Sequence, residues 1–127
     1  MSITTCHFGM HVHSLDAARE FYVGILKLSV LQDLPQIKLL ALKAGDVRLS
    51  IRADVSMSEA EAASRAGGSI IFRTANLAET VSALQRSGVA VPPVSEAPGF
   101  MKFVTLRDPS GNLVQIAEYM RDPLREA

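Results

Sequence analysis

The sequence contains an internal repeat, and this repeat limits the possible folds more than any other feature does. Helix-capping residues and apolar strand residues of the first half recur in the second half. The interval is 62 positions in the first part of each half and 65 positions near its end. The pairs 62 positions apart include Ser14 with Asn76 and Phe8 with Ile70, and the pairs 65 apart include Leu49 with Val114 and Ile51 with Ile116. An offset shared by caps and strand faces indicates a duplication of about half the chain.

Each half reads as an α+β module. Residues 5–13 alternate between apolar and polar, which predicts a strand, and Ser14 then precedes a helical stripe of apolar residues. A hairpin is expected around Gly45. In the second half a strand leads to Asn76, which is the N-cap of a helix with Glu79 placed as in a capping box, and two strands flank a D-P-S-G turn. The order of elements in each half is therefore β-α-β-β(-β). One such module could not bury its sheet alone, whereas two modules can share a hydrophobic core.

Composition sets further limits. The chain has 127 residues, of which 48% are hydrophobic and 20% charged, which is typical of a single globular domain. Its 13 basic and 13 acidic residues leave no positive excess, so we do not expect a nucleic-acid partner. The apolar runs are too short to span a membrane, and the N-terminus lacks the pattern of a signal peptide. With one cysteine and no internal disulfide possible, we expect a cytoplasmic protein.

All three histidines of the chain lie in one short stretch, and they suggest either a metal site or one face of a strand. They are His7, His11 and His13. Strand geometry carries His11 about 13 Å along from His7, so one ion cannot bind both at bond length. We therefore interpret the three as successive positions along a wall. For His13 a hydrogen-bonded side chain at the end of the strand is the better interpretation.

Three stretches together resemble the vicinal oxygen chelate superfamily, which includes glyoxalase I, bleomycin-resistance proteins, fosfomycin-resistance enzymes and extradiol dioxygenases. They are HFGMHVHSLDAAREFYVGILKLSV, GGSIIFRTANLAETVSALQRSGV and FVTLRDPSGNLVQIAEY. The resemblance implies one domain over residues 1–127, made of two βαβββ modules that form a curled mixed sheet around a cavity, with the helices outside. We place module 1 at about 3–56, a connector at 57–67 and module 2 at about 68–120.

The resemblance also implies four ligand positions for members that use a metal. They fall on His7, Ser50, Ser69 and Gln115. Serine hydroxyls and a glutamine amide are weak neutral donors, whereas a catalytic metal needs about three imidazole or carboxylate ligands. We therefore expect no metal cofactor. The alternative is one divalent ion (Fe, Mn, Ni or Zn) held by His7 and Gln115.

The strand positions that share a face with these four residues form the expected cavity wall. This wall carries histidines and arginines but no acidic residue, which favours an anionic ligand such as a carboxylate or phosphate, including one attached to an aromatic body. The alternative is that some arginines extend to the rim of the sheet. The expected ligand-binding residues are His7, His11, Arg48, Ser50, Arg52, Ser69, Arg73 and Gln115.

Three functions remain open at this point. The first is a protein that binds or sequesters a small anionic or aromatic molecule, as in the bleomycin-resistance branch. The second is a metal-dependent enzyme with an unusual ligand set: a glyoxalase-like lyase, an isomerase, an extradiol-type dioxygenase or a thiol transferase. The third is a metal-free enzyme in which His7 or His11 acts as a general base. In each case we expect a homodimer, because open curled sheets leave edges to cover.

Overall fold

The chain forms two compact units, which are described here separately. The structure is a computed structural model, and it describes residues 2–3, 7–53 and 69–120. Unit 1 holds the described residues up to Ala53 together with Asp108–Asn112, and unit 2 holds Ser69–Arg107 and the described residues from Leu113 onward. The connector expected at 57–67 lies outside the described residues.

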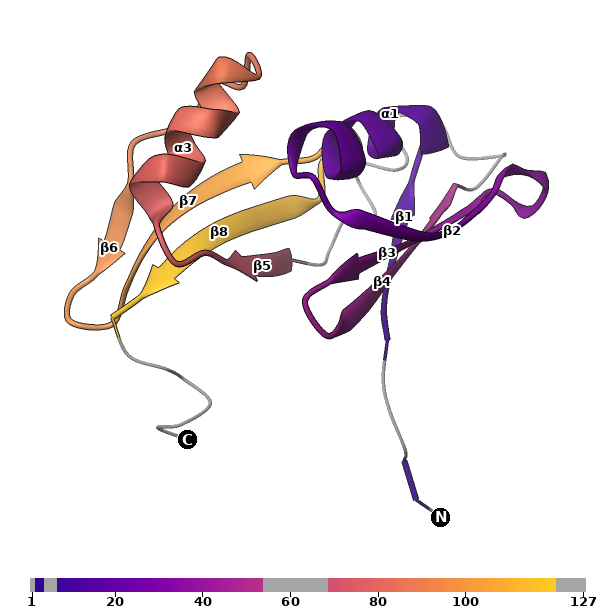
Figure 1. Cartoon of the computed structure of the whole chain (residues 1–127), viewed down its shortest axis with the longest axis horizontal. Helices are drawn as coiled ribbons and strands as arrows, with labels where there is room; N and C mark the ends of the chain where they lie inside the picture. Colours follow the sequence, from indigo (N-terminus) through magenta and orange to yellow (C-terminus); the bar gives the residue numbers. More distant parts are fainter. Residues whose placement is uncertain (1, 4–6, 54–68, 121–127) are drawn as a thin grey trace. The chain divides into compact units, whose positions relative to one another are not determined.

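Unit 1 is a four-stranded mixed sheet with one helical segment between its first two strands (Figure 1). The strand order is β1-β4-β3-β2, with β1 parallel to β4 and the other pairs antiparallel. Its elements are β1 (Phe8–Val12), α1 (Leu15–Arg19), the π-helix η1 (Glu20–Ile25), β2 (Ser29–Leu34), the 3-10 turn η2 (Pro35–Ile37), β3 (Leu39–Ala44) and β4 (Val47–Ala53).

Unit 2 repeats this plan with the strand order β5-β8-β7-β6. Its elements are β5 (Ser69–Arg73), α3 (Leu77–Arg86), β6 (Ser95–Ala97), β7 (Met101–Arg107) and β8 (Leu113–Tyr119). Strand β5 is parallel to β8, and the other two pairs are antiparallel. The described residues thus contain two four-stranded mixed sheets in an α+β arrangement, which confirms the fold class expected from the sequence.

The pairing register reproduces the two intervals seen in the sequence. In unit 1 Phe8 is paired with Leu49, and in unit 2 Ile70 is paired with Val114. The first member of each pair is shifted by 62 positions between the halves and the second by 65. The repeated positions are therefore equivalent in the two sheets, as an internal duplication requires.

One face of each sheet is apolar and packs against a helix. In unit 1 the alternating residues Leu40, Leu42, Leu49 and Ile51 are all fully buried, and α1 contacts β3 and β4. In unit 2, α3 contacts β8, and its buried residues are Leu77 and Leu84. Period two in a strand sends the remaining residues of each sheet to the opposite face, where the expected site residues lie.

The first helix differs from the regular α-helix expected after Ser14. The Ser14 side chain accepts from the Ala17 amide as an N-cap should, but the α-helix ends at Arg19 and a π-helix follows. In the last turn the Leu26 amide donates to the carbonyl of Phe21, five residues back, at 2.9 Å. This wider turn accompanies the burial of two consecutive rings, Phe21 and Tyr22, which meet edge to face with centroids 4.9 Å apart.

The D-P-S-G-N turn between β7 and β8 belongs to unit 1. Asp108 is 4% exposed, and its carboxylate accepts four hydrogen bonds, from the amides of Ser110 and Asn112, the Asn112 side chain and the Tyr22 hydroxyl, at 2.7–2.9 Å. The Asn112 side chain also donates to the carbonyl of His11 at 3.2 Å. Gly111, with φ at +87°, closes the turn in a conformation that suits glycine.

In the described parts of the chain, no helix has the length and apolar character needed to cross a lipid bilayer.

Candidate functional site

The sheet of unit 1 has a polar face opposite α1. Strand pairing places Gly9, Ser50, Ala41 and Gln32 in one row across it, and His11, Arg52, Leu39 and Leu34 in the next. A third row holds Arg48, Lys43 and Ser29. We call these eleven residues the polar face of unit 1. It carries three permanent positive charges and one histidine but no Asp or Glu, so its potential favours an anion.

Arg48 is held in place on this face by two neutral oxygens. Its Nε donates to the Ser50 hydroxyl at 3.3 Å, and its Nη2 donates to the Gln32 side-chain oxygen at 3.0 Å. Since Ala41 lies between Ser50 and Gln32 in the register, the guanidinium spans this small residue, which is 0% exposed. Arg48 itself is half-buried.

The other expected residues of unit 1 lie along the same face or at its end. His11 is paired with Arg52 in neighbouring strands, and both are exposed. His7, also exposed, directly precedes β1. The expectation that His13 is a hydrogen-bonded side chain is confirmed, because its Nδ1 lies 2.8 Å from the Ser110 hydroxyl and its backbone amide donates to the same oxygen at 2.9 Å.

The sheet of unit 2 carries the other three expected residues on the face opposite α3. Gln115 is flanked in register by Ile71 and Thr105, and its amide nitrogen donates to the Thr105 hydroxyl at 3.2 Å. Ser69 is exposed one row away, at the start of β5. Gln115 is thus already engaged within its own sheet.

Arg73 lies over an aromatic side chain of unit 2. Its guanidinium carbon is 5.5 Å from the ring centroid of Tyr119, within the range of a cation–π contact. Phe100 meets the same ring edge to face at 5.6 Å, and it remains 41% exposed. With Ile71 47% exposed, this face offers apolar and aromatic surface beside a cation.

The residues at the implied metal positions do not fit a divalent ion. In unit 1 the Ser50 hydroxyl accepts from a guanidinium, so a fixed positive charge lies beside the oxygen that a metal would need. In unit 2 Gln115 offers only a neutral amide oxygen, and Ser69 a hydroxyl. Among the residues that the structure describes, no three of His, Cys, Asp and Glu are grouped as metal ligands.

Sequence reasoning missed Gln32 and Tyr119 as members of these faces. Gln32 lies in β2, where the pairing register shifts between Val30 and Gln32, and this irregularity breaks the period-two pattern that would have shown which face it occupies. Tyr119 is two positions beyond Ala117 in β8, so its face could have been counted from Gln115. Its contact with Arg73 depends on the packing of side chains, which alternation does not predict.

Comparison with known proteins agrees with this architecture. A lactoylglutathione lyase from Agrobacterium tumefaciens is 23% identical, with a TM-score of 0.70 over 91% of this chain and 92% of its own. TnmS3, an antibiotic binding protein from Streptomyces sp. CB03234, is 23% identical, with a TM-score of 0.71 over 94% and 98% of the two chains. A glyoxalase family protein from Enterococcus faecalis is 22% identical, with a TM-score of 0.71 over 91% and 97%. At these identities the likeness concerns the fold.

Among curated proteins none matches the chain. The sequence model of one family, however, matches residues 5–116, which is most of the length and includes both repeats. The chain therefore belongs to the Glyoxalase/Bleomycin resistance protein/Dioxygenase superfamily.

Proposed function

We propose that this protein binds a small anionic or aromatic molecule without a metal, and that it does so as a cytoplasmic homodimer. The observation that carries the proposal is the polar face of unit 1, where Lys43, Arg48 and Arg52 share one side of a sheet with no carboxylate among them. Charge-assisted hydrogen bonds from guanidinium groups suit a carboxylate or phosphate. The similarity in fold to an antibiotic binding protein is consistent with a binding role.

The aromatic part of the proposal is supported by unit 2. Tyr119 and Phe100 form an edge-to-face pair beside Arg73, and a flat ring can pack on such a surface while the cation faces its substituent. In unit 1, His7, His11 and Ser50 are proposed as further polar contacts for a ligand. In unit 2, Ser69 and Gln115 are proposed in the same role.

Elemental analysis and ligand titration together test the proposal. Protein purified without a chelator or an affinity tag should hold no stoichiometric Fe, Mn, Ni or Zn. A panel of aliphatic and aromatic carboxylates should raise its melting temperature, and added divalent metal should leave that increase unchanged. About one metal per chain, lost together with activity in His7→Ala, would instead establish a metal-dependent lyase, isomerase, dioxygenase or thiol transferase.

Substitution of arginines then separates specific binding from a general charge effect. Arg52→Ala and Arg73→Ala should each weaken an anionic ligand by about 1.5–3 kcal/mol where the contact is charge-assisted and buried. Arg86→Ala is the matched control, because Arg86 is exposed in the last turn of α3 and lies on neither face. Equal losses in all three variants would point to non-specific attraction.

A further inference from the structure

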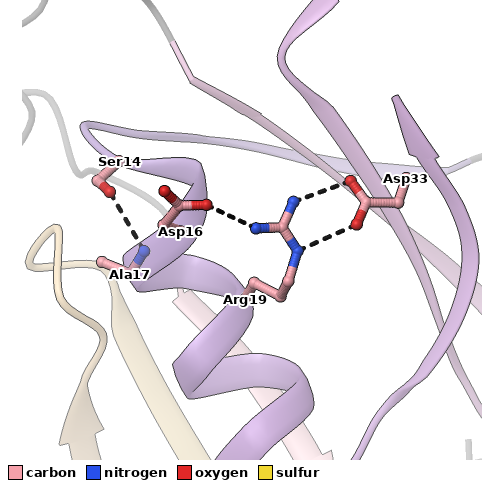
Figure 2. Close-up of polar contacts among 5 residues, drawn as sticks. All are labelled: Ser14, Asp16, Ala17, Arg19 and Asp33. Carbon is pink, nitrogen blue, oxygen red and sulfur yellow. Dashed lines mark hydrogen bonds and ion pairs between the residues drawn. The ribbon is translucent and has the colours of Figure 1, made fainter. Parts of the chain in front are cut away.

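Two arginines of unit 1 have opposite electrostatic surroundings. Arg19 is held by acids: its Nε and Nη2 donate to the two carboxylate oxygens of Asp33 at 3.0 and 2.8 Å, and its Nη1 donates to Asp16 at 2.7 Å (Figure 2). The pKa of Arg19 is raised above its usual value, mainly because its guanidinium donates to Asp33. Arg48, on the other side of the same sheet, donates among the described residues to the neutral oxygens of Ser50 and Gln32.

The neutral contacts of Arg48 fix its position without cancelling its charge. They use two of the five N–H groups that a guanidinium carries, one at Nε and one at Nη2. The cost of ordering a long side chain is thus met before a ligand arrives, which favours binding. Two hydrogen bonds, one to Ser50 on the same strand β4 and one to Gln32 on β2 beyond β3, orient the plane of the group, so it presents a defined edge rather than a freely rotating charge.

From this arrangement we infer that Arg48 is a preorganised receptor for the carboxylate group of the ligand, and that Gln32 is the residue that positions it. The inference rests on the proposed function and adds to it the functional group recognised and the residue that sets the geometry. Within the same unit, the Arg19–Asp33 pair shows the paired hydrogen bonds that a guanidinium and a carboxylate form (Figure 2). A ligand carboxylate can form paired hydrogen bonds with Arg48 at the edge made by Nη1 and Nη2, because the single Nε hydrogen, which binds Asp33 in Arg19, already donates to Ser50 in Arg48.

The small side chain of Ala41 contributes to the receptor. Ala41 lies between the two strands that carry Ser50 and Gln32, and a larger residue there would lift the guanidinium from the sheet. Lys43 and Arg52, in the rows on either side, add positive charge, and no Asp or Glu lies among the residues of the polar face. The recognised group is therefore a planar carboxylate on a small molecule, aligned with the oriented guanidinium.

Nuclear magnetic resonance of the arginine Nε–H groups tests the inference directly. Benzoate should shift the Arg48 Nε–H signal saturably, whereas benzamide, which has the same shape without the charge, should not. Gln32→Leu should weaken benzoate binding by roughly threefold to tenfold because the guanidinium loses one positioning hydrogen bond. Arg48→Lys, which keeps the charge but not the planar group, should weaken it by about tenfold or more.

Two further variants complete the design. Gln32→Glu keeps an acceptor beside Arg48 but adds a charge that competes with the ligand, so benzoate binding should be lost while the Arg48 Nε–H signal remains sharp. Arg86→Lys, on α3 in unit 2, is the matched control and should leave benzoate binding unchanged. Folding of each variant is checked by its melting temperature, and the wild-type titration decides the question even if a variant fails to fold.

The outcomes separate this inference from the proposed function. If benzoate shifts Arg52 or Arg73 while Arg48 is unmoved, or if Gln32→Leu binds as well as the wild type, the receptor is wrong and the anion-binding function stands. If neither benzoate nor inorganic phosphate shifts any arginine signal, both fail together. If phosphate binds at Arg48 and benzoate does not, the assignment of a carboxylate is wrong.

Discussion

Asp108 is a buried carboxylate whose hydrogen bonds come from neutral donors. Its four partners are two backbone amides, the Asn112 side chain and the Tyr22 hydroxyl. Neutral donors stabilise a buried charge only while all of them are in place, because each lost bond leaves a lone pair without water or partner. The hydrogen bond from the Tyr22 hydroxyl to Asp108 is the shortest of the four at 2.7 Å, and Tyr22 is 0% exposed.

Tyr22 makes the stability of the protein sensitive to alkaline pH. Burial, together with the hydrogen bond to Asp108 and its charge, raises the pKa of Tyr22 well above its usual value of 10. The unfolded chain therefore releases this proton above about pH 10 while the folded chain keeps it. The free energy of unfolding should then fall by about 1.4 kcal/mol per pH unit from this group, and the stabilisation is fully present below pH 10.

Tyr22→Phe should remove this dependence. At neutral pH it should lower the free energy of unfolding by about 1.5–3 kcal/mol, because Asp108 loses a donor. Above pH 10 the difference between the variant and the wild type should shrink, as measured by urea unfolding at a series of pH values. Tyr119→Phe is the control, since it removes the only other tyrosine of the chain. A difference that stays constant through pH 11 would contradict the assignment.

Helix α3 begins with two caps of different origin. The Asn76 side chain accepts from the Glu79 amide at 3.1 Å, as the sequence predicted. The amide of Leu77 instead donates to the Glu118 carboxylate at 2.9 Å, which comes from the end of β8. The Asn76 amide donates to the Thr74 hydroxyl at 3.3 Å, so in place of a reciprocal capping box a neighbouring hydroxyl satisfies it.

Asn76→Ala should therefore lower the free energy of unfolding by about 1 kcal/mol, since one amide at the helix start loses its acceptor. Ser82→Ala is a matched control in the same helix. Ser82 is exposed in the middle of α3, and alanine is the better helix former, so this change should be neutral or stabilising by about 0.5 kcal/mol. Chemical denaturation followed by circular dichroism measures both, and equal losses would show that Asn76 does not act as a cap.

The elements that follow local rules were predictable from the sequence, and those set by distant contacts were not. The hairpin of β3 and β4 has its turn at Gly45, with φ at +60°, and α3 starts after Asn76, because turns and caps depend on neighbouring residues. Strand β6 is only three residues long and forms by pairing with β7, so it has too few residues to show a period.

For the candidate site, the sequence predicts only which residues share a face of a sheet. Alternation placed Arg48, Ser50 and Arg52 on one side of β4, and the register shows all three there. The role of Gln32 depends on a register shift in β2, and the contact of Arg73 with Tyr119 depends on rotamers. The sequence therefore predicted which residues share a surface but not which of them hold one another.

An exposed edge of the unit 1 sheet bears on the assembly of the protein. Strand β2 is an edge of the unit 1 sheet, and its residues Val30 and Leu31 are 45% and 47% exposed. Exposed apolar edge strands tend to be covered by another chain. We predict a homodimer at micromolar concentration, measured by light scattering coupled to size exclusion.

Leu31→Lys should shift that dimer toward monomer, because a lysine on an edge strand opposes pairing. Val47→Lys is the control: Val47 is 52% exposed but begins β4, which is an inner strand of the same sheet. A wild-type chain that scatters as a monomer at micromolar concentration would contradict the prediction of a dimer.

The D-P-S-G-N turn has a consequence for the order in which the molecule can be completed during synthesis. Tyr22 and Asp108 are 86 residues apart, and His13 and Ser110 are 97 apart. When the ribosome has made the first half, the Tyr22 hydroxyl can reach the sulfur of Met10 but still lacks the Asp108 carboxylate. The first repeat therefore cannot complete its hydrogen bonds until the end of the second half has been synthesised. We expect the pairing of these two distant segments to be slow, because it closes a long loop. Of the two repeats in the chain, the first is completed only by five residues, Asp108–Asn112, that lie within the second.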